Sequence, residues 1–276
     1  MSKDQELCRV CRVNAASSFE HVPPRGAFND GPLRLHGIEN WLTGDDGQLD
    51  GGRIQQRGSG VPSLCGRCNN DTGSWYAKEL ITAAASGARI LRELSLKDLD
   101  KKLEPAYIEI AFRQSETGPH PLRFIKQIIT MLLAVSPLEF SLKNPLLGDF
   151  VLDRERTGLP NRYQVYLALY AGPLMRIVGG AARLKLDTSR TDFIVEVAFP
   201  PFAYAMTVDS EPEGIETTNI TACANARYMD RADLEMQMLV GFGHTPLPAD
   251  YRTKAMVNDE AARNKAMIHL RPANPT

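Results

Sequence analysis

The sequence of 276 residues lacks any hydrophobic run of the roughly 18–20 residues that a membrane-spanning helix needs. Its first residues, Met1–Leu7, lack the apolar segment of a secretory signal peptide, so we expect a cytoplasmic protein without membrane contact. Neither sign of charge is in large excess, since the net charge is −1, which excludes a polybasic coat for nucleic acid. With 43% hydrophobic and 24% charged residues, the composition also excludes widespread disorder.

Cysteine is scarce but strongly patterned. Four of the five cysteines form two C-x-x-C pairs, Cys8 with Cys11 and Cys65 with Cys68, and 53 residues separate the pairs. Disulfides are disfavoured in the cytoplasm, and two residues between thiolates let one turn of backbone present both sulfurs to one ion. We therefore predict a structural Zn²⁺ site that joins two distant segments, in preference to a thioredoxin-like redox pair. The remaining Cys223 lies in an apolar stretch, where we expect a buried small side chain.

Polar residues suited to hydrolytic chemistry accompany both cysteine pairs. Glu20 and His21 follow the first pair, and Asn69 directly follows the second. Neighbouring side chains of an extended segment point to opposite faces, so Glu20 and His21 diverge unless a bend or a partner strand shapes one site around both. A neutral imidazole takes a proton from water near pH 7, and carboxylate and amide oxygens suit Mg²⁺, which keeps several waters. The alternative is a polar strand end beside a purely structural zinc site.

The order of these residues resembles the HNH, or ββα-metal, endonucleases. The shared pattern is C-x-x-C, then Glu-His-Val-Pro-Pro, then C-x-x-C-Asn, and it covers residues 8–76. The closest subtype is the zinc-stapled one, which includes phage Holliday-junction endonucleases and many bacterial HNH proteins. The resemblance implies an N-terminal ββα-metal module that hydrolyses phosphodiester bonds in DNA. Bacterial proteins of this kind also imply a role in defence against phage.

The resemblance further implies a role for each matching residue. His21 falls at the position of the general base, whereas Glu20 and Asn69 fall where the family holds a catalytic Mg²⁺ or Mn²⁺. The middle Asn of the motif lies in the hairpin connection, where Asn40 and Asn29 both qualify; we include Asn40 among the catalytic candidates and leave Asn29 open. The connection, residues 26–64, is longer than is typical of the family and rich in glycine, which suggests a mobile flap.

Basic and aromatic residues near the motif are candidates for contacts with nucleic acid. Phosphate contacts position a nucleic acid on a protein, and a solvated surface is the alternative for such side chains. The basic candidates are Arg25, Arg57, Arg67 and Lys78. Trp75 and Tyr76 either stack on bases or belong to the core, and we favour the core. Asp71 is expected to cap the start of a helix rather than to bind a metal.

The fold class that the periodicities predict is α+β. We place an HNH-like module and its following helix at residues 1–98, and an α+β domain of unknown role at residues 99–276. The first domain ends in a helix over 74–94, and the second is helical over 118–158 and rich in antiparallel β-strands over 162–245. This sheet forms a sandwich or a partly closed barrel. Strands are expected at 107–112, 163–170, 175–186, 193–199, 203–208, 217–224 and 236–242, and a short helix at 258–268.

The C-terminal region lacks a phosphate-binding loop, a dinucleotide fingerprint and a nucleophile–base pair. Residues 187–276 carry 8 basic and 13 acidic side chains, a poor composition for binding phosphate. We expect this region to act as a scaffold, to bind an activating protein or ligand, or to form a homo-oligomer. For the whole chain, a DNA endonuclease is the leading hypothesis. The alternatives are a non-catalytic zinc-stapled module that binds nucleic acid or protein, and a nuclease acting on RNA or DNA junctions.

Overall fold

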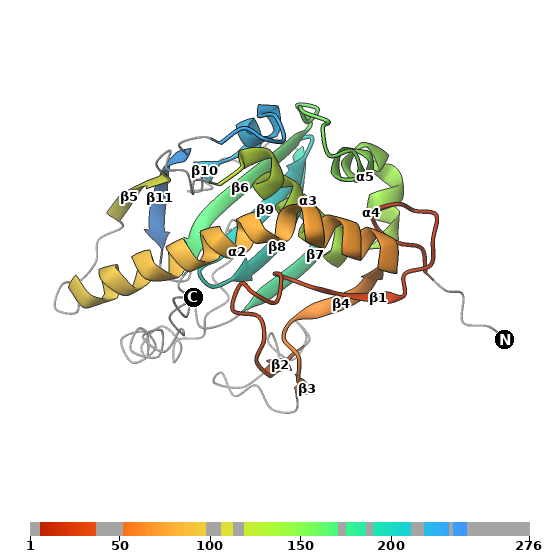
Figure 1. Ribbon diagram of the computed structural model, residues 1–276. Coiled ribbons are helices and arrows are strands. Elements are labelled where there is room, and N and C mark those ends of the chain that lie inside the picture. The colour runs from red at the N-terminus through yellow and green to blue at the C-terminus, as the bar shows by residue number, and fades with distance from the viewer. Residues whose placement is uncertain are drawn as a thin grey trace.

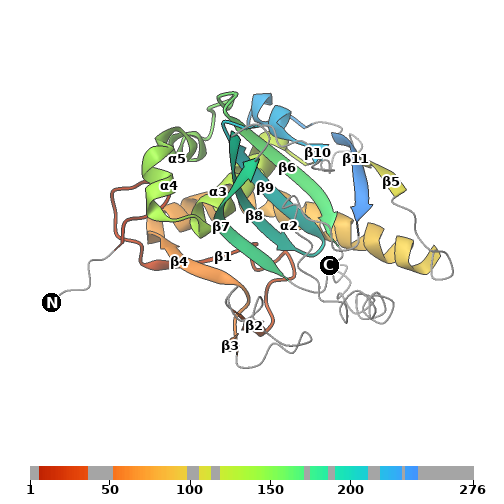
Figure 2. The ribbon, with the colours of Figure 1, turned by 180° about the vertical axis from the view of Figure 1, so that it is seen from behind.

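The N-terminal part of the chain forms a β-hairpin that leads into a 32-residue helix. The computed structural model describes residues 6–36, 52–97, 106–112, 119–170, 175–185, 190–210, 218–231 and 234–241. Strand β1 (Ser18–His21) pairs antiparallel with β4 (Gly60–Leu64), and helix α2 (Gly66–Lys97) follows β4 almost directly. A second pair, β2 (Leu33–Leu35) and β3 (Arg53–Gln55), lies within the connection. Both views place this pair below the body of the molecule (Figures 1 and 2).

Helix α2 begins earlier than the expected residue 74, because the second cysteine pair forms its first turn. The backbone N–H of Asn69 donates to the carbonyl of Cys65 at 3.0 Å, which closes that turn. The expectation that Asp71 caps the helix is wrong, since Asp71 lies inside it and forms an ion pair with Arg67 at 3.6 Å. The apolar stripe of the helix is buried as expected, with Tyr76, Leu80, Ala84 and Leu91 in the core.

Three further helices follow. Helix α3 (Pro121–Val135) starts at a proline, which suits the first helical position, and is almost entirely buried. The broken helix expected next is two helices, α4 (Leu138–Lys143) and α5 (Pro145–Leu152). The break falls at Asn144, whose side-chain amide donates to the carbonyl of Phe140 at 2.9 Å and so satisfies an acceptor that the ended helix leaves free.

The C-terminal part of the described chain builds a seven-stranded sheet. Its order is β5–β11–β6–β9–β8–β7, with the short β10 paired to β6. All pairs are antiparallel except β11 with β6, which is parallel and departs from the expected all-antiparallel sheet. The described strands of the C-terminal part form one open sheet rather than the expected sandwich or barrel. The strands are β5 (Ala106–Phe112), β6 (Tyr163–Tyr170), β7 (Arg176–Lys185), β8 (Arg190–Phe199), β9 (Phe202–Val208), β10 (Thr218–Asn219) and β11 (Leu234–Gly241).

Helices α2 and α3 lie on one face of this sheet, and Figure 2 shows the opposite face turned toward the viewer. Alternate residues of the central strands pack against the helices, among them Leu167, Val195 and Tyr204, which are at most 1% exposed. The strand expected at 217–224 is mostly wrong: after β10 the chain forms the 3-10 helix η2 (Thr221–Asn225). Cys223 lies there, buried as expected.

Two arginines join the first cysteine turn to the helices of the C-terminal part. The Arg9 side chain donates from Nε to the carbonyl of Ser136 at 3.1 Å, and Arg12 pairs with Asp149 of α5 at 2.6 Å. Val10 between them is fully buried. The hydrophobic core is therefore continuous from the cysteine-bearing segments through α3 to the sheet.

Some expectations lie outside the described residues. These are the helix at 258–268 and the domain boundary near residue 98. Among the described residues, no helix is both long and apolar enough to cross a membrane.

Candidate functional site

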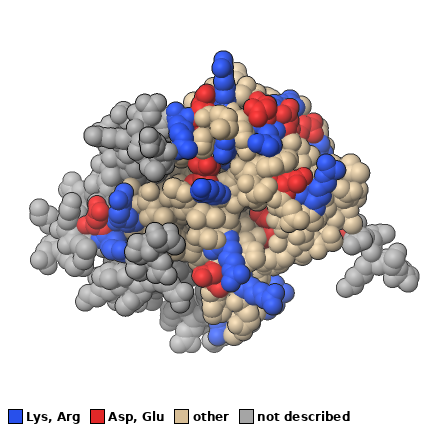
Figure 3. All heavy atoms as spheres, in the orientation of Figure 1, with Lys and Arg blue, Asp and Glu red and all other residues tan. Residues whose placement is uncertain are grey.

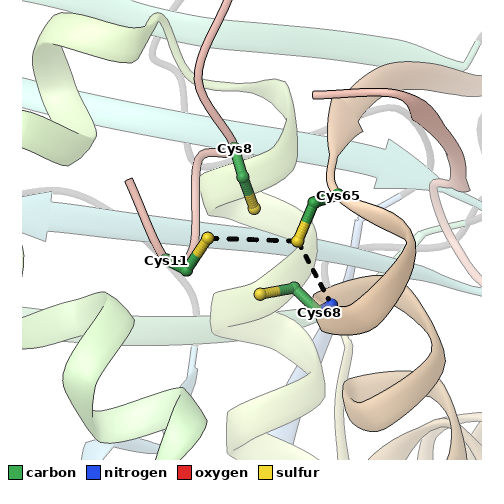
Figure 4. A group of neighbouring side chains, drawn as sticks. All are labelled: Cys8, Cys11, Cys65 and Cys68. Carbon is green, nitrogen blue, oxygen red and sulfur yellow. Dashed lines mark hydrogen bonds between the residues drawn. The ribbon is translucent and has the colours of Figure 1, made fainter. Parts of the chain in front are cut away.

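The four paired cysteines come together at the junction of the N-terminal turn, β4 and α2. Their sulfur atoms all lie within 4.8 Å of one another, and the Sγ atoms of Cys11 and Cys65 are 3.9 Å apart (Figure 4). In a tetrahedral Zn²⁺ site with Zn–S bonds of about 2.3 Å, sulfurs lie about 3.8 Å apart. The four side chains converge on a common centre in Figure 4 and fit such an ion. The predicted cysteine cluster that can hold a structural metal is thus confirmed.

Backbone geometry explains how each pair is presented. An isolated bridge between Leu7 and Ala15 closes the first turn, and the N–H of Cys8 donates to the carbonyl of Asn14 at 2.7 Å. In the second pair, the N–H of Cys68 donates to Sγ of Cys65 at 3.5 Å, so that a helix N-terminus faces the sulfur. Positive helix termini and backbone N–H donors favour the thiolate form that binds metal.

The cysteine cluster is electrostatically coupled. A hydrogen bond from Cys68 lowers the pKa of Cys8 to about 4, and the same interaction, with burial, raises the pKa of Cys68. The contact between these two thiols thus shifts their pKa values in opposite directions, and a cation at the centre would favour loss of the protons from all four. Outside this cluster, no group of three or more His, Cys, Asp or Glu side chains within the described ranges is placed to share an ion.

Glu20 is a buried carboxylate of the β-hairpin that leads into α2. It lies on β1 opposite Val61 of β4, and a bulge interrupts the pairing between Ser18 and Glu20. Glu20 is only 7% exposed, and this burial raises the pKa of its carboxyl group to about 8. Within the described ranges, no donor or cation bonds this carboxylate. The carboxylate oxygens are not among the fully enclosed side-chain atoms without a partner, so they retain some contact with solvent, and a cation bound there would compensate their partly desolvated charge.

His21 lies next to Glu20 but on the other face of the strand. Its ring packs edge to face on Phe19 with centroids 5.0 Å apart, whereas Glu20 points to the buried side. The Nε2 atom lies 3.0 Å from the carbonyl oxygen of Arg57. Because a carbonyl only accepts, Nε2 carries the hydrogen, and the tautomer with this hydrogen bond has its lone pair on Nδ1. The side chains therefore diverge along β1, as alternation predicts.

Asn69 reaches from the first turn of α2 to β1. Its Nδ2 atom donates to Oγ of Ser18 at 2.7 Å and to the carbonyl oxygen of Phe19 at 3.0 Å. Ser18 and Glu20 are two residues apart on the strand and share a face. The hydrogen bonds thus bring Asn69 to the face of β1 that carries Glu20.

The sequence offers Asn40 and Asn29 as the middle Asn of the motif. Asn40 lies outside the described residues, whereas Asn29 is 1% exposed and joins both ends of the hairpin connection. Its amide donates to the carbonyls of Pro23 and Ser59, and its oxygen accepts from the N–H of Ser59. Asn29 thereby holds the segment after His21 against the segment before β4. Its neighbours Phe28 and Asp30 give it no stronger signal in the sequence than Asn40 has.

The basic candidates lie on the surface around these elements. All four are exposed, and Arg67 also pairs with Asp71. Figure 3 shows cationic and anionic side chains interspersed over the face that carries α2, without one large basic patch. Of the two aromatic candidates, Tyr76 is fully buried and donates its hydroxyl hydrogen to the carbonyl of Val151 at 2.8 Å. Trp75 packs against the same core, with the Arg154 guanidinium 5.6 Å from its ring centroid.

In comparisons with known proteins, no protein-family model, curated protein or solved structure matches the chain.

Proposed function

We propose that this chain is a divalent-metal-dependent endonuclease of the HNH kind that hydrolyses phosphodiester bonds in DNA. The observation that carries the proposal is the Glu20 carboxylate, which is buried and unpartnered within the described residues, on the face of β1 where Asn69 arrives. A cation bound there would compensate the charge. A carboxylate and an amide oxygen are hard ligands that suit Mg²⁺ or Mn²⁺, because these ions keep waters and accept phosphate oxygens as further ligands.

His21 is the general base in this proposal; because it is the last residue of β1 and lies on the face opposite Glu20, the scissile phosphate must reach both side chains around that end of the strand. The hydrogen bond from Nε2 to the Arg57 carbonyl selects the tautomer whose Nδ1 can take a proton from water. That carbonyl belongs to the segment that Asn29 ties to the residues after His21. Asn29 therefore limits the movement of the base relative to its partner, and it replaces Asn40 as our candidate for the supporting Asn.

The bound divalent ion would act as a Lewis acid on the phosphodiester and its leaving oxygen. The chain's own residues supply the remaining functions. Glu20 and Asn69 hold the ion, and the exposed Arg25 and Arg57 lie near the ends of the hairpin connection, where they can bind flanking phosphates. Zn²⁺ in the four-cysteine cluster would fix the start of α2, and hence Asn69, relative to the hairpin that carries Glu20.

The test is cleavage of plasmid DNA by zinc-loaded protein with Mg²⁺ or Mn²⁺, beside His21→Ala. The matched control is His120→Asn, which alters an imidazole at the start of α3. We expect wild type and control to nick the plasmid, and His21→Ala to lose at least a hundredfold in rate, the lower range for general-base catalysis. Equal cleavage by wild type and His21→Ala would refute the role of His21.

Substrate class is tested in the same assay with a linear duplex, a four-way junction and a structured RNA. The proposal expects the highest rate on duplex DNA. Preference for the junction or for RNA would keep the hydrolytic mechanism and correct the substrate. Absence of cleavage on every substrate with either ion would leave the chain as a zinc-stapled binding module and refute the nuclease proposal.

A further inference from the structure

The side-chain amide of Asn69 has a defined orientation. Its Nδ2 atom lies 2.7 Å from Oγ of Ser18 and 3.0 Å from the carbonyl oxygen of Phe19. Because the Phe19 carbonyl can only accept, the nitrogen and not the oxygen of the amide must face β1. Both amide hydrogens are then used. The Oδ1 atom lies at the other end of the planar amide, and no donor within the described residues bonds it.

Ser18 is well placed to hold this orientation. Pairing of β1 with β4 sets Ser18 opposite Leu64, the residue directly before the second cysteine pair. The N–H of Ser17 adds a hydrogen bond to the carbonyl of Leu64 at 3.0 Å. Ser18 is thus anchored to the segment that enters α2, and it shares a face of β1 with Glu20. The Ser18 hydroxyl thus connects β1, which carries the proposed ligand Glu20, to the side chain of the other proposed ligand, Asn69.

We propose that Ser18 is a positioning residue for the divalent-cation site: by accepting a hydrogen bond from Asn69 Nδ2, it keeps Asn69 Oδ1 free to bind the ion. This inference rests on the proposed function. Without the hydroxyl, Asn69 retains only the backbone acceptor, and its amide can rotate and present a nitrogen, which cannot bind a cation. Partners that orient metal ligands typically contribute about 10–100-fold to metal affinity. In Ser18→Ala the hydrogen bond from Asn69 to the Phe19 carbonyl remains, so we expect a loss of metal affinity near the lower end of this range.

The experiment measures Mn²⁺ binding to the full-length, zinc-loaded chain without DNA, by calorimetric titration. We expect Ser18→Ala to raise the Kd for Mn²⁺ about tenfold. Ser18→Thr retains the hydroxyl and suits a strand, so its Kd should stay within about twofold of wild type. The matched control is Ser17→Ala, which removes an exposed neighbouring hydroxyl with no hydrogen bond to Asn69. Thermal unfolding of each variant verifies that a weaker Mn²⁺ affinity does not result from a failure to fold.

Cleavage assays then separate positioning from catalysis. Ser18→Ala should need about tenfold more Mn²⁺ for half-maximal cleavage, yet reach the wild-type rate at saturation with an unchanged pH profile, because His21 is untouched. An unchanged Kd in Ser18→Ala, or the same change in Ser17→Ala, would overturn the inference. If Glu20→Gln weakens Mn²⁺ binding and Ser18→Ala does not, the proposed function stands and only this inference fails. If neither variant weakens binding, the proposed cation site itself is refuted.

Discussion

Replacing Glu20 with Gln should stabilise the protein while abolishing its proposed divalent-cation site. Burial raises the pKa of Glu20 from 4.5 to about 8. At pH 7 the unfolded chain carries this group ionised, whereas the folded chain must bind a proton or bury the charge, which costs about 3 kcal/mol. The amide is neutral at every pH and similar in shape, so Glu20→Gln avoids this cost.

The pH dependence gives the sharper measurement. Because the folded state binds the Glu20 proton more tightly than the unfolded state, this group's contribution to stability falls as pH rises from about 4.5 to 8. The advantage of Glu20→Gln over wild type, measured by urea denaturation of zinc-loaded protein without other divalent ions, should therefore grow from near zero at pH 4.5 to about 4 kcal/mol at pH 8. Adding Mg²⁺ at a hundred times its Kd should stabilise wild type by about 2.7 kcal/mol and leave Glu20→Gln unchanged.

A second buried glutamate supplies the control. Glu79 of α2 is 9% exposed but accepts from the N–H of His120 at 3.1 Å and lies 3.9 Å from the Arg123 guanidinium. Glu79→Gln removes a partnered charge and should destabilise the protein. The reasoning is refuted if Glu20→Gln also destabilises, or if the difference between Glu20→Gln and wild type does not change with pH, since either result means that the Glu20 carboxylate is paired in the folded state.

Three further changes test the surrounding structure. Cys65→Ser should lose bound zinc in metal analysis and lower the melting temperature far more than Cys223→Ala, because structural zinc contributes about 10–16 kcal/mol; similar losses would contradict the shared site. A double-mutant cycle of Arg12→Ala and Asp149→Ala, measured by urea denaturation, should give a coupling of about 0.5–1 kcal/mol, and no coupling would show that this contact does not hold the cysteine turn to α5. Asn29→Ala should destabilise by about 2–3 kcal/mol in the same assay because it leaves buried backbone groups unpaired, and a neutral change would refute its role as the link across the connection.

Local patterns in the sequence were sufficient for several elements. The helix α3 followed from its apolar periodicity and the proline at its start, and the central strands followed from alternation. The prediction of a strand at residues 217–224 was mostly wrong. The β-branched residues there favour a strand locally, but the chain pairs with β6 only at Thr218 and Asn219 and then forms the 3-10 helix η2. The parallel pairing of β11 with β6 also depends on where distant strands meet, which no local pattern encodes.

The sequence by itself determined the two cysteine pairs and the order of polar residues around them, because two thiols separated by two residues can present both sulfurs to one ion; the meeting of the pairs, 54 residues apart at Cys11 and Cys65, is a tertiary contact. Only the tertiary structure decided which polar groups face one another. It places Glu20 in the interior without a partner, turns Asn69 so that its nitrogen faces β1, and brings Asn29 to Pro23 and Ser59. These are hydrogen bonds and burial between segments 6–51 residues apart, and such contacts arise when strands and helices pack, not from the neighbours of a residue along the chain.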